Sequence, residues 1–168
     1  MAERNPNLIS PKAMEAMAST ANSGRELYSE IFTKINNAKD KPKKVSILRQ
    51  HNTPNMRMVL KGAFDPKIEW DLPPGVPPYI ANEAPAGTEH TYLELEAKRL
   101  YNFVKGGNNQ LNKIRKETLF IQMLEGLHAD EAKILIDMKN KTLNKTYKGL
   151  TSEMVKEAFG WNADFVKP

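Results

Sequence analysis

The stretch KILIDMKNKTLNKTYKGLTSEMVKEAFGW, from Lys133 to Trp161, is the most informative part of the chain for its fold. It begins within an amphipathic segment, 129–140, whose apolar residues recur at helical spacing. A Gly-Leu-Thr-Ser turn at 149–152 then opens a second short helical segment. Between them, the fourteen residues 139–152 contain four lysines and no carboxylate. We therefore expect two helices joined by a strongly basic connector.

Helical periodicity also dominates the rest of the sequence. Capping-box patterns at Ser23–Glu26 and Thr91–Glu94 predict helix starts, as do prolines in the first turns after Lys41 and Thr53. No stretch shows sustained alternation with period two, so we predict an all-α protein, a single helical bundle of about seven helices. The predicted helices run from about 23 to 37, 41 to 49, 53 to 62, 91 to 105, 111 to 127, 129 to 140 and 151 to 159.

Proline divides this helical pattern once. Residues 71–88, DLPPGVPPYIANEAPAGT, contain five prolines and two glycines, and proline lacks the N–H that helices and sheets require. We expect a long loop held in place by Trp70 and Tyr79. The predicted organisation is a flexible tail at 1–22, a helical domain at 23–161 and a second tail at 162–168.

Composition narrows the functional classes. The 168 residues are 40% hydrophobic and 27% charged, and they include no cysteine, which excludes disulfides and thiolate chemistry. No apolar run is long enough to span a bilayer, and the first twenty residues lack a hydrophobic signal core. We therefore expect no membrane association and a cytoplasmic location.

The charge of +5 is unevenly distributed. Residues 1–70 carry twelve Lys/Arg and seven Asp/Glu, residues 71–104 carry two and five, and residues 105–168 carry eleven and eight. Two basic portions thus flank an acidic middle. This pattern suits a negatively charged partner such as nucleic acid, although many proteins of this charge bind no polyanion.

The sequence offers no catalytic or metal-binding constellation. His51, His90 and His128 lie far apart and lack a second ligand at helical spacing. No phosphate-binding, dinucleotide-binding, nucleophile-elbow or zinc-protease motif is present. We expect a protein that is not an enzyme and that requires no cofactor and no metal.

Two short motifs carry a resemblance to a known family. Gly62-Ala63-Phe64-Asp65-Pro66 closes an early helix, and Lys148-Gly149-Leu150-Thr151-Ser152-Glu153 forms a late turn before a helix. This order resembles the N-terminal helical DNA-binding domain of phage-type ATP-dependent DNA ligases over about residues 25–161. Phe159-Gly160-Trp161 departs from the family pattern, which has a proline there. Strings such as KGAFDP also resemble uncharacterised chains of tailed phages.

The resemblance implies a DNA-gripping domain without catalysis, because the chain lacks the Lys-x-Asp-Gly adenylation motif of ligases. In that family the domain binds the minor groove and the phosphate backbone. By analogy, Gly149 would allow the turn, Thr151 or Ser152 would cap the following helix, and free N–H groups there would meet a phosphate. The cations expected to contribute are Lys139, Lys141, Lys145 and Lys148 on the connector and Lys44, Arg57 and Lys61 in the first basic portion.

Three functions therefore stay open. The first is a phage accessory protein that binds duplex DNA in the host cytoplasm during replication, repair or packaging. The second is a protein-interaction module that uses loop 71–88 to modulate a host or phage enzyme. The third is a virion-associated role.

Overall fold

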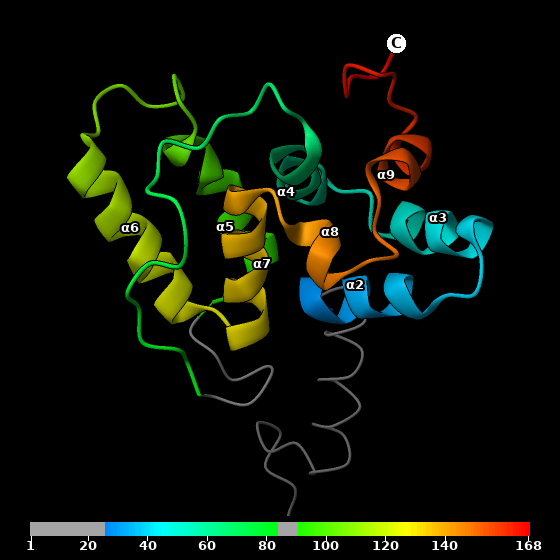
Figure 1. The fold of residues 1–168 in the computed structure, drawn as a ribbon, viewed down its shortest axis with the longest axis horizontal. Helices are drawn as coiled ribbons and strands as arrows, with labels where there is room; N and C mark the ends of the chain where they lie inside the picture. Colours follow the sequence, from blue (N-terminus) through cyan, green and yellow to red (C-terminus); the bar gives the residue numbers. More distant parts are fainter. Residues whose placement is uncertain (1–25, 84–90) are drawn as a thin grey trace, which may run out of the picture.

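A computed structural model describes residues 26–83 and 91–168 and shows an all-α fold, as predicted (Figure 1). The described residues form eight α-helices and one 3₁₀-helix, and they contain no strand. The predicted tail at 1–22, most of the capping box at Ser23–Glu26 and the end of loop 71–88 lie outside the described residues. The helices are α2 (Tyr28–Asn37), α3 (Lys41–Gln50), α4 (Pro54–Phe64), α5 (Leu93–Glu96), η1 (Ala97–Phe103), α6 (Lys113–Gly126), α7 (Ala129–Asn140), α8 (Leu143–Thr146) and α9 (Ser152–Phe159).

Helix α7 is the centre of the bundle. Ile134, Leu135 and Met138 are fully buried, and α7 packs against α2, α4, α6 and α8. A helix that is covered on most sides in this way organises a core rather than presenting a surface. Figure 1 shows α6 at one end of the long axis and α3 with α9 at the other, so α7 separates two ends with different neighbours.

Side-chain caps fix several helix starts. The oxygens of Asp40, Thr53, Asn112 and Thr151 accept the N–H three residues later at 2.9, 3.1, 2.7 and 3.2 Å. The predicted cap at Thr91 is wrong, because the helix begins after Tyr92 and the Thr91 hydroxyl donates to Glu96 instead. The helix expected to follow becomes a 3₁₀-helix from Ala97 onward, and α8 was not predicted.

One buried carboxylate joins three helices. Glu131 on α7 is fully buried and accepts the N–H of Tyr28 at 2.7 Å and of Leu93 at 2.9 Å. These are the first residues of α2 and α5, so one negative side chain satisfies orphan donors at two positive helix ends. The Tyr28 hydroxyl also donates to Glu94 on α5. Glu131 thereby fixes where the first described helix enters the bundle.

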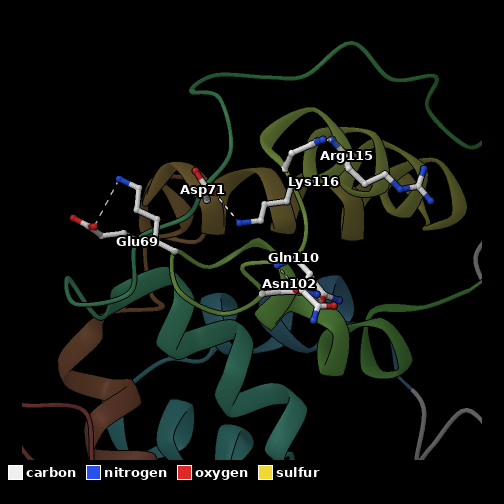
Figure 2. A network of polar contacts seen from close by, with 9 residues as sticks. Glu69, Asp71, Asn102, Gln110, Arg115 and Lys116 are labelled. Carbon is white, nitrogen blue, oxygen red and sulfur yellow. Dashed lines mark hydrogen bonds and ion pairs between the residues drawn. The ribbon is translucent and has the colours of Figure 1, made fainter.

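Two backbone hydrogen bonds and one ion pair hold the start of the Pro-rich loop. The Asp71 N–H donates to Phe103 O at 2.7 Å, and the Lys105 N–H donates to Glu69 O at 2.9 Å. Figure 2 shows Lys116 reaching from α6 to Asp71, and their charged groups lie 2.8 Å apart. The Lys116 ammonium beside Asp71 lowers the pKa of that carboxyl.

Residues 162–168, the predicted second tail, follow α9 as a short turn whose Asp164 carbonyl accepts a hydrogen bond from Lys67 Nζ at 2.8 Å. The Asn162 N–H donates to Val166 O at 2.9 Å, which closes a compact turn. Phe165 is buried in this turn, with a left-handed φ of 60°. Its ring lies 6.1 Å from that of Trp161. The segment therefore forms part of the surface beside α4.

Candidate nucleic-acid interface

The basic connector between α7 and α9 bends at Gly149, where it lies against the end of α2. The Gly149 N–H donates to Asn36 Oδ1 at 2.7 Å. A Cβ atom on Gly149 would lie 2.9 Å from Lys44 Nζ and 3.2 Å from Asn36 Cα, so the absence of a side chain permits this approach. Figure 1 shows the segment after α8 running along α2 before it rises to α9 beside α3. The two basic portions of the sequence therefore meet at this bend.

Three lysines on the segments that meet at this bend keep their ammonium groups available. Lys145 and Lys148 lie on the connector, and Lys39 lies in the turn between α2 and α3. All three side chains are exposed, and none makes a hydrogen bond or ion pair with a described residue. We call Lys39, Lys145 and Lys148 the cationic edge. Unpaired, solvated ammonium groups are the ones that can approach a phosphate without breaking an existing contact.

Two other lysines near the junction are paired with acids. Lys41 lies 3.2 Å from Glu157 on α9, and Lys43 lies 4.0 Å from Asp40. Exposed pairs of this kind are weak. Because each pair is neutral overall, these two lysines are less available to a phosphate than the three unpaired lysines of the edge.

Lys44, expected to contact DNA, instead caps α2. Its ammonium donates to Ile35 O at 3.0 Å and Ala38 O at 2.7 Å. These carbonyls belong to the last turn of α2 and to the residue that follows it, where the negative end of the helix dipole favours a cation. Lys44 therefore supports the cationic edge from beneath and does not belong to it.

Lys139 and Lys141 also have internal partners. Lys139 is only 8% exposed, and its three N–H groups donate to Pro73 O, Gly75 O and Asn140 Oδ1. Lys141 donates to Gly62 O at 2.5 Å and Asp65 O at 3.0 Å. Burial lowers the pKa of both amines. These lysines tie the loop and the end of α4 to the bundle, so we leave them out of the cationic edge.

The start of α9 is capped but does not form the expected phosphate site. Thr151 accepts the Met154 N–H, which removes one of the donors that a phosphate would use. The N–H groups of Ser152 and Glu153 remain near a cavity of about 830 Å³ between α9 and the segment after α4. Glu69 and Glu153 line that cavity together with Lys139 and Lys141, so the charges around the helix end balance and do not select an anion.

Arg57 and Lys61 lie elsewhere, on the face of α4 that meets the C-terminal segment. They line a groove with Trp161, Phe165 and Lys167. The predicted DNA-binding lysines and arginine therefore fall into three groups. Lys145 and Lys148 belong to the cationic edge, and Arg57 and Lys61 line the groove. Lys44, Lys139 and Lys141 donate to backbone oxygens within the bundle.

Two features of this region were not visible in the sequence analysis. Asn36 accepts the Gly149 N–H across 113 residues, but an asparagine near a helix end is ordinarily interpreted as a local cap. Lys116 is 3% exposed although it lies among exposed charges on α6. Its position four residues before Phe120 places both on one helix face, and that spacing was the available signal.

The described residues contain no group of three or more His, Asp or Glu side chains that could hold a metal ion. No helix among them combines the length and apolar character required to cross a bilayer.

A family model described as a family of unknown function, DUF6433, matches residues 31–145, more than half of the chain. The chain belongs to the DUF6433 family. The DUF6433 match extends from α2 into α8, so it includes Asn36, Lys39 and Lys145 but ends before the Gly149 bend. No curated protein and no solved structure matches the chain.

Proposed function

We propose that this chain is a non-enzymatic accessory protein that binds duplex DNA through its phosphate backbone. The observation that supports this proposal best is the hydrogen bond from Gly149 to Asn36, because it joins the two basic portions of the sequence at one place. The cationic edge there has three exposed and unpaired lysines. Contacts from lysine to phosphate carry no base-specific information, so binding is expected to be independent of sequence.

The wider setting of the proposal comes from the resemblance to phage-type ligase domains. On this proposal the protein acts in replication, repair or packaging of phage DNA within the host cytoplasm. In this setting the chain holds DNA for other proteins and performs no reaction itself.

Three lysine contacts define the expected salt dependence. Each neutralised phosphate contributes about −0.9 to the slope of log K against log salt, so three contacts give a slope of about −3. Binding should therefore weaken on the order of 50-fold between 50 and 200 mM salt. Lys41 and Lys43 can raise the slope further if DNA displaces their exposed acidic partners.

The test is fluorescence anisotropy with a labelled duplex of about 20 base pairs, at several salt concentrations, for the wild type and Lys145→Glu/Lys148→Glu. The double variant should lose most of the affinity and flatten the salt slope. The matched control is Lys113→Glu/Arg115→Glu on α6, which changes the net charge equally at the opposite end of the molecule (Figure 1). Equal losses in both variants would show attraction without a site, and absence of salt-sensitive binding by the wild type would refute the proposal.

A second candidate, a protein-interaction module, is favoured by the rigid presentation of the Pro-rich loop. Val76 and Ile80 are 71% and 80% exposed. The backbone around them is held by Lys139 and by the bond from the Ile80 N–H to Glu125 at 2.8 Å. Trp70, which we expected to hold the loop in place, is buried. Replacing Val76 and Ile80 by serine should abolish capture of a protein partner from host lysate, and unchanged capture would exclude this surface.

A further inference from the structure

A groove on α4 combines cations with aromatic rings. It is about 360 Å³ in volume and is bounded by α4 on one side and the C-terminal segment on the other. None of its lining residues is a carboxylate. This distinguishes it from the larger cavity at the start of α9, where two glutamates stand among the lining residues. The groove is lined by Pro54, Arg57, Met58, Lys61, Trp161, Phe165, Val166 and Lys167.

The cations of the groove are largely available. The ammonium groups of Lys61, which is half-buried, and Lys167, which is exposed, make no hydrogen bond or ion pair with any residue in the described ranges. Arg57 donates through one guanidinium nitrogen to Asn52 Oδ1 at 2.5 Å, which leaves its other N–H groups for a ligand. Lys156 adds a fourth charge nearby, since its ammonium lies 5.0 Å from the centre of the Phe165 ring.

One carboxylate lies close to the groove. Asp164 directly precedes Phe165 in the C-terminal turn and is exposed. The Asp164 carbonyl accepts a hydrogen bond from Lys67 Nζ at 2.8 Å, which brings a further cation beside it. The local balance therefore stays positive.

Trp161 supplies a fixed aromatic surface. Its ring is partly exposed and packs against Phe159 with a centroid distance of 4.9 Å and against Phe165 at 6.1 Å. The turn that carries Phe165 is closed by backbone and Asn162 side-chain hydrogen bonds, such as the Asp164 N–H to Asn162 Oδ1 at 2.8 Å. A ring held in this way can stack with a ligand at little cost in side-chain entropy.

From this arrangement we infer that the groove binds single-stranded nucleic acid, with one unpaired base stacked on Trp161 and the adjoining phosphates at Arg57, Lys61 and Lys167. Stacking platforms next to cationic side chains are the general means of holding single strands. A paired duplex cannot use such a platform, because its bases already stack on one another. The cationic edge differs in this respect, since the nearby Tyr147 is partly buried against Phe32 at a ring distance of 5.5 Å.

The inference deepens the proposed function and rests on it. The edge would hold duplex backbone, while the groove would hold an unpaired nucleotide. A protein with both sites would favour DNA that contains a junction between paired and unpaired strands.

The experiment follows intrinsic tryptophan fluorescence while (dT)12 is added at low salt. The chain has two tryptophans, and Trp70 is 8% exposed, so stacking should quench the emission of Trp161. In a parallel anisotropy assay, Trp161→Leu should weaken (dT)12 binding about tenfold, as expected for the loss of one base–aromatic stack. It should leave duplex binding unchanged.

Two further variants keep the result interpretable. Arg57→Gln/Lys61→Gln preserves Trp161 and the apolar packing, and it should also weaken (dT)12 binding without affecting the duplex. Tyr101→Leu removes an exposed aromatic ring from η1, outside the groove, and should change nothing.

The outcomes separate the two ideas. If (dT)12 causes no quenching, or if Trp161→Leu and the Arg57/Lys61 variant bind it as the wild type does, the groove inference is refuted while salt-sensitive duplex binding can stand. If the duplex fails to bind but (dT)12 quenches Trp161, the proposed function fails and the groove remains. Equal quenching by poly-glutamate would identify a general anion site and overturn the assignment to nucleic acid.

Discussion

The buried Glu131 carboxylate permits a sharp test of how the bundle is assembled. Glu131→Gln keeps the size of the side chain but removes its charge. The glutamine oxygen can accept from only one side, so either the Tyr28 or the Leu93 N–H then faces an amide NH₂ group. The substitution therefore leaves a helix start unsatisfied inside the core.

The magnitude follows from the two contacts. A hydrogen bond to a charged group contributes about 1.5–3 kcal/mol, and a neutral one contributes about 1 kcal/mol. Replacing two charged bonds by one neutral bond should lower the free energy of unfolding by about 3 kcal/mol. In a protein of this size the melting temperature should fall by about 6–12 °C.

The assay is urea unfolding followed by circular dichroism at neutral pH, with Glu153→Gln as the control. Glu153 is exposed, and its side chain makes no hydrogen bond or ion pair with a described residue, so its replacement should change stability by less than about 0.5 kcal/mol. A Glu131→Gln variant as stable as this control would refute the view that one carboxylate anchors α2 and α5.

Other predictions follow from the contacts of Trp70 and Asp71. A Cβ atom on Gly62 would lie 2.4 Å from Trp70 Cζ2, so Gly62→Ala should destabilise the fold by about 1–3 kcal/mol in thermal unfolding; unchanged stability would contradict this packing. Asp71→Asn leaves the buried Lys116 unpaired and should lower the free energy of unfolding by about 3 kcal/mol at pH 7. This is the low end of the range for broken buried ion pairs, because the Asp71 side chain is 19% exposed. Because Lys116 lowers the Asp71 pKa, this stabilisation is present above the unfolded pKa of about 4 and is lost as pH falls through the lower folded value. The stability gap between wild type and Asp71→Asn, measured by urea unfolding, should therefore shrink below about pH 4, whereas a constant gap would exclude the ion pair as its source. Burial raises the pKa of Tyr147 to about 12, so its phenol should titrate above the usual phenol pKa of about 10 in an ultraviolet pH titration.

Local sequence signals predicted most of the helices because their causes are local. Asp40 with Pro42 and Thr53 with Pro54 satisfy or remove the first N–H groups within a few residues, and both starts are confirmed. Thr91 misled the prediction because its hydroxyl has a competing acceptor, Glu96, five residues later.

The sequence could not show which lysines are free to bind a ligand, because their hydrogen-bond partners lie far away in the chain. Lys139 and Lys145 are both lysines of the basic connector, and they lie six residues apart. Only the folded chain brings the carbonyls of Pro73 and Gly75 to Lys139, across more than sixty residues. A run of lysines therefore predicts how much positive charge a segment carries. Whether each ammonium group is free to bind a ligand depends on backbone atoms from distant parts of the chain.

The bond between Gly149 and Asn36 has a consequence for how the protein is made. Its two partners are separated by 113 positions. When α2 and α3 have left the ribosome, Lys145 and Lys148 of the cationic edge have therefore not yet been synthesised. A product truncated before Lys145 would keep every helix through α7 and still lack two of the three exposed lysines. The surface proposed to touch DNA thus comes into being only after residues 145–149 have been synthesised.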